Sequence, residues 1–186
     1  MALLAALDRR NRSLITRPLI AAALALVVAL GVLAWVASTR LGGDDDVQRQ
    51  REAAMSQARQ FMLRIGTYGP DKLDAQGRMP AYAEQVREVI TPKFAAEFDK
   101  EGGRLAEQLV AQGGVSRDAE VFATGISDLD ADSAVALVSG TFTDSYPDGK
   151  SRLVAQEPVP VRLSVQLVKV DGDWLVDDFG PAGGAR

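Results

Sequence analysis

The chain has 186 residues and a formal net charge of −4, and it contains neither cysteine nor histidine. Without cysteine there are no disulfides, thiol catalysis or cysteine-based metal sites, and without histidine the commonest general base and metal ligand are missing. Residues 1–39 carry +3, which leaves −7 for residues 40–186. An acidic remainder argues against nucleic acid as a partner. We therefore expect a protein that is not an enzyme, with no catalytic residue, cofactor or metal.

An apolar run from Leu19 to Ala37 contains no charged side chain, and at 1.5 Å per residue it spans roughly 28 Å, close to the thickness of a hydrocarbon core. Arginines precede it and acidic residues follow it. We predict a cytoplasmic tail over residues 1–18, a transmembrane signal-anchor over 19–38, and an exported remainder at the cell membrane. A cleavable signal peptide is the alternative, although a cut after Ala37 would leave bulky Trp35 three residues before the break. The anchor residues are Leu19, Leu24, Leu26, Val28, Leu30, Leu33 and Trp35.

Helical signals dominate the first half of the exported part, residues 47–186, which we expect to be one domain behind a spacer over 39–46. Asp46 is the predicted N-cap of a helix over residues 47–65. Further helices are predicted over 81–90, 92–100 and 104–112, with Gly102-Gly103 as a break between the last two. The apolar stripe of the first helix is formed by Ala54, Ala58, Phe61, Met62 and Ile65.

After residue 118 the pattern becomes that of strands, predicted over residues 120–127, 133–144, 159–168 and 174–179. The third strand alternates clearly, with Val159, Val161, Leu163, Val165 and Leu167 on one face. Asp171-Gly172 predicts a tight hairpin turn into the last strand. Helices followed by four antiparallel strands predict an α+β domain, with the helices packed on one face of a curved sheet.

Several segments resemble the Mce-associated membrane proteins of actinobacteria. Besides the basic tail and membrane helix, they are Thr67-Tyr68 after the first exported helix, Thr91 to Ala95, and the block from Val168 to Pro181. The resemblance covers nearly the whole chain in order. It implies a ketosteroid-isomerase-like (cystatin-like) cone, also similar to the inner-membrane assembly factor of type IV secretion. It further implies a non-catalytic accessory role beside Mce lipid and sterol importers, through contacts with their protein subunits.

Asp177 and Asp178 are the sharpest chemical candidates. Neighbours on a strand face opposite sides, so one carboxylate should face the cone interior. There it could be a desolvated base of raised pKa near Trp174, with Tyr68 among the phenols that could serve as oxyanion donor. We favour the alternative, a carboxylate that accepts hydrogen bonds from loop backbone. Trp174 is expected to be a core or cavity-rim aromatic, with ligand stacking as the alternative.

Two acidic runs invite a metal hypothesis that we do not favour. Asp44 to Asp46 are consecutive in the spacer, so they converge on one ion poorly. The run at Asp128, Asp130 and Asp132 lacks the glycine and the distal glutamate of an EF-hand loop. Both are expected to be solvated.

The expected function is a membrane-anchored accessory protein that supports assembly or stability of an Mce-type lipid or sterol import complex. Its expected partners are the lipid bilayer and protein subunits of the transporter, with a lipid ligand in the cone as a further hypothesis. The alternatives are a tethered isomerase or dehydratase that uses an inward-facing aspartate, and a scaffold subunit of a type IV secretion-like machine.

Overall fold

The computed structural model describes residues 29, 31–32 and 45–183. The chain divides into two compact units, Met1–Gln48 and Arg49–Arg186, and apart from residues 45–48 of the first helix the elements described below belong to the second. The predicted anchor residues Leu19, Leu24, Leu26, Val28, Leu30, Leu33 and Trp35 lie outside the described residues. Among the residues that are described, no helix is both long and apolar enough to cross a bilayer.

A long helix opens the described domain and is followed by a compact helical layer. Residues 45–66 are helical, so Asp46 lies inside the helix and is not its N-cap as predicted. A short 3-10 turn, η1 (Pro70–Lys72), leads to α2 (Pro80–Arg87), α3 (Pro92–Lys100) and α4 (Gly102–Gly113). The predicted stripe on the long helix is confirmed, since Ala54, Ala58, Phe61 and Met62 are fully buried and Ile65 partly so.

The glycine pair at 102–103 begins α4 and does not separate two helices. The break lies at Glu101, whose backbone is not helical. Gly103 is needed for close packing, because a Cβ there would lie 3.1 Å from the Phe98 ring. Gly114 ends this helix in the left-handed conformation, with φ of 62°.

The second half of the domain is one antiparallel sheet in the order β1-β2-β4-β5, with β3 paired to β2 beyond the end of β4. Its strands are β1 (Ser116–Leu129), β2 (Ser133–Pro147), β3 (Leu153–Ala155), β4 (Val159–Val170) and β5 (Asp173–Pro181). The Asp171-Gly172 turn between β4 and β5 is confirmed, with φ of 54° and 98°. The sheet therefore has five strands where four were predicted.

The missing strand and the longer β1 have local causes. β3 has only three residues, all exposed, and so shows no alternation. β1 contains register shifts between Val121 and Ala123 and between Ile126 and Asp128. Each shift is a bulge that resets which face the next side chain occupies, so the period of two is broken along the strand.

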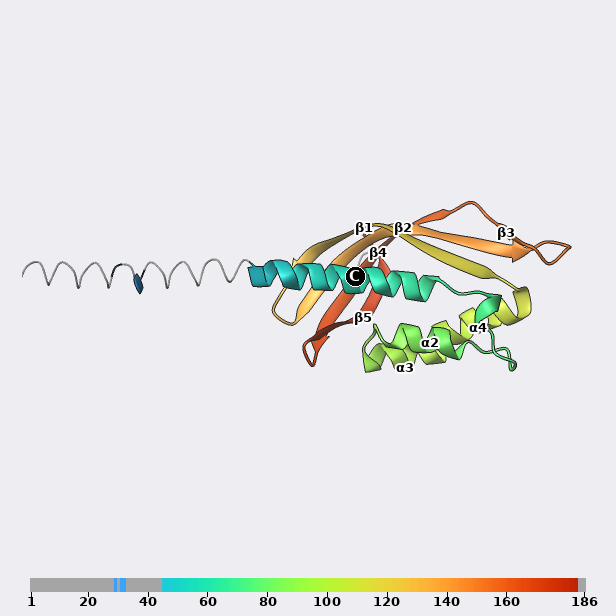
Figure 1. The fold of residues 1–186 in the computed structure, drawn as a ribbon, viewed down its shortest axis with the longest axis horizontal. Helices are drawn as coiled ribbons and strands as arrows, with labels where there is room; N and C mark the ends of the chain where they lie inside the picture. The colour runs from blue at the N-terminus through green and yellow to red at the C-terminus, as the bar shows by residue number, and fades with distance from the viewer. Residues whose placement is uncertain (1–28, 30, 33–44, 184–186) are drawn as a thin grey trace, which may run out of the picture. The chain divides into compact units, whose positions relative to one another are not determined.

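The helices lie on one face of the curved sheet and leave the other face open (Figure 1). The core lies between them, with Ala136, Val165, Leu167 and Val176 of the sheet buried against the stripe of the long helix. The chain is thus an α+β domain of two layers, as predicted. We call the helix-covered face the inner face and the opposite one the outer face.

The long helix crosses the sheet very closely at Gly140 in β2. A Cβ at this position would collide with the Glu120 carbonyl oxygen of β1 and lie 2.7 Å from Cε of Met62. Only glycine fits, because one of the two obstacles is backbone and cannot move aside.

We expect Gly140→Ala to destabilise the domain by about 1–3 kcal/mol, the usual cost of overpacking. Gly125→Ala is the matched control, because a Cβ at Gly125 in β1 meets nothing within 4 Å. Chemical denaturation of the full chain should show a lower midpoint for the first variant only. Equal midpoints would mean that the helix does not cross at this position.

Trp174 closes the other end of the core. It is 6% exposed, its indole Nε1 donates to Oε1 of Gln50 at 3.2 Å, and Lys169 Nζ lies 4.9 Å from the ring centroid. We expect Trp174→Ala to lower the free energy of unfolding by about 3–5 kcal/mol, as large aromatic truncations do. A loss below about 1 kcal/mol would contradict this packing.

Candidate functional site

A cavity of about 300 Å³ lies between the helical layer and the inner face of the sheet and opens to solvent. The helices contribute Ile65, Tyr82, Phe98, Leu105, Ala106 and Leu109 to its walls. Tyr68 from the loop after the long helix, Gly102, Arg117 of β1 and Phe179 of β5 complete them. The lining is almost wholly apolar, as in most small-molecule sites.

Aromatic rings give this cavity a firm wall. Tyr68 and Tyr82 meet edge to face with ring centroids 5.6 Å apart, and Phe98 lies 5.9 Å from Tyr82. Phe179 contacts Phe61 of the long helix at 5.1 Å, also edge to face. Such pairs fix ring orientation, so the cavity is largely preformed.

The two phenols of the cavity stay protonated near neutral pH. The Tyr82 hydroxyl donates to the carbonyl oxygen of Ile65 at 2.9 Å, and burial raises the pKa of this phenol strongly. Burial also raises the pKa of Tyr68, an effect that nearby Arg117 partly opposes. Tyr68, named from the sequence among the phenols that could serve as oxyanion donor, therefore lines the cavity as a neutral phenol.

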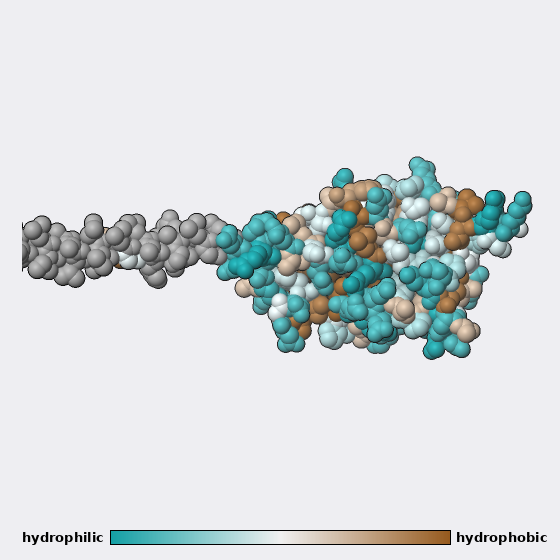
Figure 2. Space-filling view, in the orientation of Figure 1, coloured by the Kyte–Doolittle hydropathy of each residue, from teal (hydrophilic) through white to brown (hydrophobic). Residues whose placement is uncertain are grey.

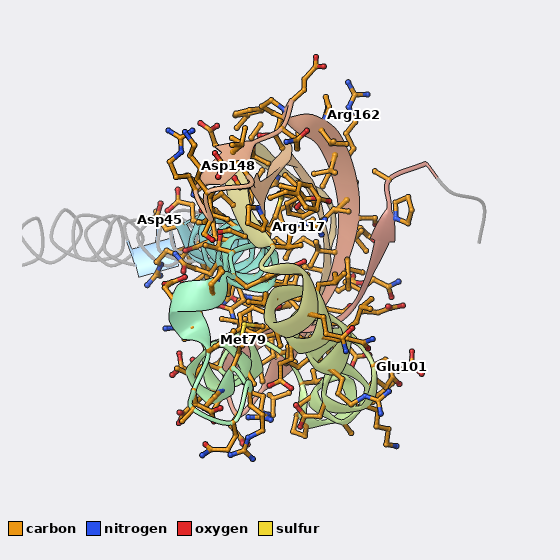
Figure 3. All side chains as sticks on the ribbon, turned by 90° about the vertical axis from the view of Figure 1, so that its right-hand side faces the viewer. Asp45, Met79, Glu101, Arg117, Asp148 and Arg162 are labelled. Carbon is orange, nitrogen blue, oxygen red and sulfur yellow. The ribbon has the colours of Figure 1, made fainter. Side chains whose placement is uncertain are left out.

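Arg117 supplies the charge at the cavity, but this charge is already neutralised. Its Nε and Nη2 donate to the two carboxylate oxygens of Asp144 at 2.6 and 2.8 Å. The guanidinium also lies over the rings of Tyr68 and Phe142, 5.7 and 5.3 Å from their centroids. Figure 3 labels Arg117 in the space between the sheet and the helices. The hydrogen bonds from Arg117 hold the pKa of Asp144 below its usual value.

Asp177 lies outside this cavity, at the edge of the sheet next to α3. It is the extra residue of a bulge in β5, because Val176 pairs with Leu167 and Asp178 pairs with Gln166. The bulge changes the alternation so that Phe179 faces inward. Asp177 instead accepts hydrogen bonds from Thr91 Oγ1 at 2.8 Å and Lys93 Nζ at 2.9 Å.

These bonds make Asp177 a poor general base. The hydrogen bond from Lys93, followed by that from Thr91, holds its pKa below the usual value, whereas the catalytic hypothesis required a raised pKa. Thr91 is at the same time the N-cap of α3, accepting from the Phe94 amide at 3.2 Å. Asp177 thus joins two of the segments on which the sequence resemblance rests, Thr91 to Ala95 and Val168 to Pro181.

The remaining predicted candidates are placed separately. Asp178 is exposed and accepts from the amide of Phe179, and Trp174 is a core aromatic that does not line the cavity. Asp130 and Asp132 lie in the turn between β1 and β2. The amide of Asp130 donates to the carbonyl oxygen of Ser133, and the amide of Lys169 donates to the carbonyl oxygen of Asp132. Among the described residues, no cluster of three acidic side chains could hold a metal.

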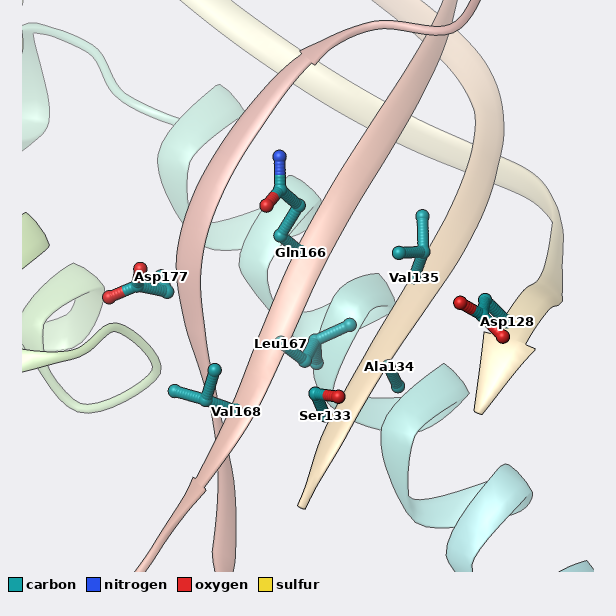
Figure 4. Close-up of a pocket in the computed structure, with 8 residues that line it drawn as sticks. All are labelled: Asp128, Ser133, Ala134, Val135, Gln166, Leu167, Val168 and Asp177. Atoms are coloured by element: carbon teal, nitrogen blue, oxygen red, sulfur yellow. The ribbon is translucent and has the colours of Figure 1, made fainter. Parts of the chain in front are cut away.

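The outer face of the sheet carries a second surface feature. Four residues that pair across neighbouring strands form one row there: Gly125, Leu137, Ser164 and Gly180. Leu137, within this row, is 45% exposed. Beside this row lies a shallow hollow of about 190 Å³, lined in part by Val135, Gln166 and Val168. Figure 4 views it with the long helix behind the strands, and Asp177 and Asp128 lie on opposite edges and do not converge.

Sequence reasoning missed Arg117, Leu105, Leu109 and Leu137. A signal existed for the two leucines, which lie four residues apart on α4 and so share one helix face, next to the buried Ala106 and Val110. No sequence signal joins Arg117 to Asp144, because their pairing depends on the β1–β2 register.

Comparison with known proteins gives distant relatives. No protein-family model matches the chain. It is homologous to the uncharacterized protein Rv1362c of Mycobacterium tuberculosis H37Rv, with 24% identity over 159 residues that span 85% of this chain and 68% of that protein. MT1407 of M. tuberculosis CDC 1551 matches to the same extent. The chain therefore has an actinobacterial homologue.

Solved structures overlap with the chain more loosely. An Ntf2-like protein involved in plasmid conjugation superposes with a TM-score of 0.46 and 14% identity, over 72% of this chain and about half, 49%, of that chain. VirB8 of Agrobacterium tumefaciens superposes with a TM-score of 0.45 and 13% identity, over 70% of this chain and 92% of that chain. A periplasmic fragment of TraM superposes with a TM-score of 0.48 and 6% identity, over 69% of this chain and 93% of that chain.

Asp177 predicts a specific dependence of stability on pH. Because its pKa is lower in the folded state, its contribution is present above the pKa of the unfolded chain and is lost as pH falls through the folded pKa. We expect Asp177→Asn to cost roughly 1 kcal/mol at pH 7, since the ion pair is partly exposed, and nothing at strongly acidic pH. Denaturation midpoints at several pH values would measure this.

Asp178→Asn is the control for this prediction, because it conserves size on an exposed side chain. Its midpoint at pH 7 should stay within about 0.5 kcal/mol of the wild type. An Asp177→Asn variant that is more stable than the wild type at pH 7 would show that the carboxylate is strained and does not stabilise the fold.

Proposed function

We propose that the protein is a membrane-anchored, non-catalytic accessory protein that supports assembly or stability of an Mce-type lipid or sterol import complex. In this proposal residues 19–38 anchor the chain in the cell membrane, and the cone domain contacts transporter subunits outside the cytoplasm. The resemblance to Mce-associated proteins of actinobacteria supports it, and the chain has an actinobacterial homologue.

The outer face of the sheet is the observation that carries this proposal. Leu137 lies there, 45% exposed, and a Cβ at Gly125 or Gly180, the glycines at the ends of its row, would meet no described residue within 4 Å. Glycine within a strand often marks the close approach of another backbone. An exposed leucine between small residues, beside a shallow hollow, is a suitable surface for a protein subunit.

The rival function, a tethered isomerase or dehydratase, has less support. It requires a carboxylate of raised pKa in the apolar cavity, next to a phenol. Tyr68 and Tyr82 line that cavity, whereas Asp177 lies in the contact with Thr91 and Lys93 and has a lowered pKa. The third hypothesis, a scaffold subunit of a type IV secretion-like machine, is not supported by any specific feature of the described residues.

Variants in the host cell test the accessory role. We expect Leu137→Asp to reduce the abundance of importer subunits and lipid uptake several-fold, because a charge in a protein interface is desolvated. Leu109→Asp, at a similar exposure of 41% but on α4, should leave the abundance of the importer subunits unchanged. Immunoblots of the subunits and uptake of labelled lipid would measure this.

Two further variants separate binding from chemistry. Asp177→Asn and Asp178→Asn, if folded, should support near-normal uptake, whereas loss of a general base costs about 10²–10⁴-fold in rate. The exported domain without residues 1–40 should support assembly poorly, because tethering raises its effective concentration near its partners. A folded Asp177→Asn variant that remains in its complex but abolishes uptake would favour the enzyme.

A further inference from the structure

The volume of the apolar cavity limits what it can hold. About 300 Å³ is roughly twice the ~150 Å³ of an engineered cavity that holds one benzene molecule, so there is room for roughly a dozen carbon atoms. This accommodates most of one acyl chain. The fused rings and tail of a sterol, or both chains of a phospholipid, are too large.

The chemistry of the lining indicates that the buried part of the ligand is hydrocarbon. The Arg117 guanidinium is paired in a bidentate fashion with Asp144, so a second anion would have to displace a carboxylate that is already well placed. The Tyr82 hydroxyl already donates its hydrogen bond to the Ile65 carbonyl oxygen. A charged headgroup would therefore stay outside, in water.

Apolar surface continues beyond the cavity on the helix side. Leu105 and Leu109 line the cavity and are nevertheless 59% and 41% exposed. They lie four residues apart on α4, which places them about 6 Å apart along the helix axis. They form a short apolar ridge along which a chain can lie.

The sheet offers matching surface on its inner face. Val159 pairs with Phe142, and Tyr146, four residues along β2 from Phe142, pairs with Val154. Side chains two and four apart on a strand share a face, so these residues lie on the same side of the sheet as the cavity. Tyr146, Val154 and Val159 remain 46%, 47% and 61% exposed.

The C-terminal end of α4 lies beside the end of β2. A Cβ at Gly114, the C-cap of α4, would lie 3.2 Å from Cγ of Pro147 at the end of β2, so the end of the helix touches the end of the sheet. Figure 2 shows an apolar patch close to the end of the sheet that carries β3. The cavity itself has an apolar mouth at Leu105 and Leu109 of α4, which line it and remain exposed.

We propose that this cavity binds a single acyl chain, with its end among the rings of Tyr68, Tyr82 and Phe98 and its polar end at the mouth. The inference goes beyond the accessory role and rests on the cavity alone. Two sources can provide such a chain, a free fatty acid or one chain of a membrane phospholipid.

Photocrosslinking of the full chain in phospholipid nanodiscs tests this proposal. The probes are palmitate, phosphatidylcholine and cholesterol, each with a diazirine in its apolar part, and labelled peptides are mapped by mass spectrometry. We expect saturable labelling of α4 and β5 peptides by palmitate, competed by unlabelled palmitate. Labelling of the same peptides by the phosphatidylcholine probe identifies a membrane lipid as the source, and its absence identifies a free fatty acid.

A reciprocal pair of variants makes the test specific. Leu109→Asp places a carboxylate at the mouth and should reduce this labelling at least about tenfold, because the chain would have to desolvate the charge. Leu137→Asp, on the outer face at similar exposure, should leave labelling unchanged. Circular dichroism and the denaturation midpoint establish that both variants are folded.

Three results would overturn the proposal. They are preferential labelling of the cavity by the cholesterol probe, labelling confined to peptides outside the cavity, and equal effects of the two variants. Because importer abundance is measured separately, failure here leaves the accessory role standing, and loss of that role leaves the acyl-chain site standing.

Discussion

The close crossing of the long helix over β1 and β2 at Gly140 is the constraint on which the rest of the domain depends. With no Cβ in the way, Met62 reaches the sheet and the helix lies directly on the inner face. The helical layer of α2, α3 and α4 then covers the remaining space incompletely. The apolar cavity lies in the space that remains, between these helices and the inner face at Arg117 of β1 and Phe179 of β5.

Much of this architecture could be predicted from sequence, because local chemistry determined it. The stripe of the long helix, the Thr91-Pro92 start of α3 and the Asp171-Gly172 hairpin each depend on neighbouring residues alone. The bulges of β1 could not be predicted from the sequence, because a bulge depends on how two strands pair. The three-residue β3 could not be predicted because it is too short to show alternation. At Val159 the predicted alternation is kept, but the side chain is 61% exposed because no helix lies over it.

The site was harder to predict than the fold for the same reason. Tyr68, a candidate from the sequence, lines the cavity, but its neighbours there come from six different segments between Ile65 and Phe179. Asp177 attracted attention because two adjacent carboxylates are conspicuous in a sequence. In the structure it joins the first turn of α3 to the last strand through Thr91 and Lys93, and so it holds the helical layer against the edge of the sheet.

The bulge at Asp177 also determines what kind of chemistry the cavity can support. If β5 paired regularly from Val176 onward, Asp178 would take the inner position and Phe179 would turn to the outer face. A carboxylate would then stand in an apolar, ring-lined cavity beside two neutral phenols, where desolvation would raise its pKa toward that of a useful base. A binding domain and an acid–base catalyst with this architecture thus differ by one residue of strand register, which offers a short evolutionary route between them.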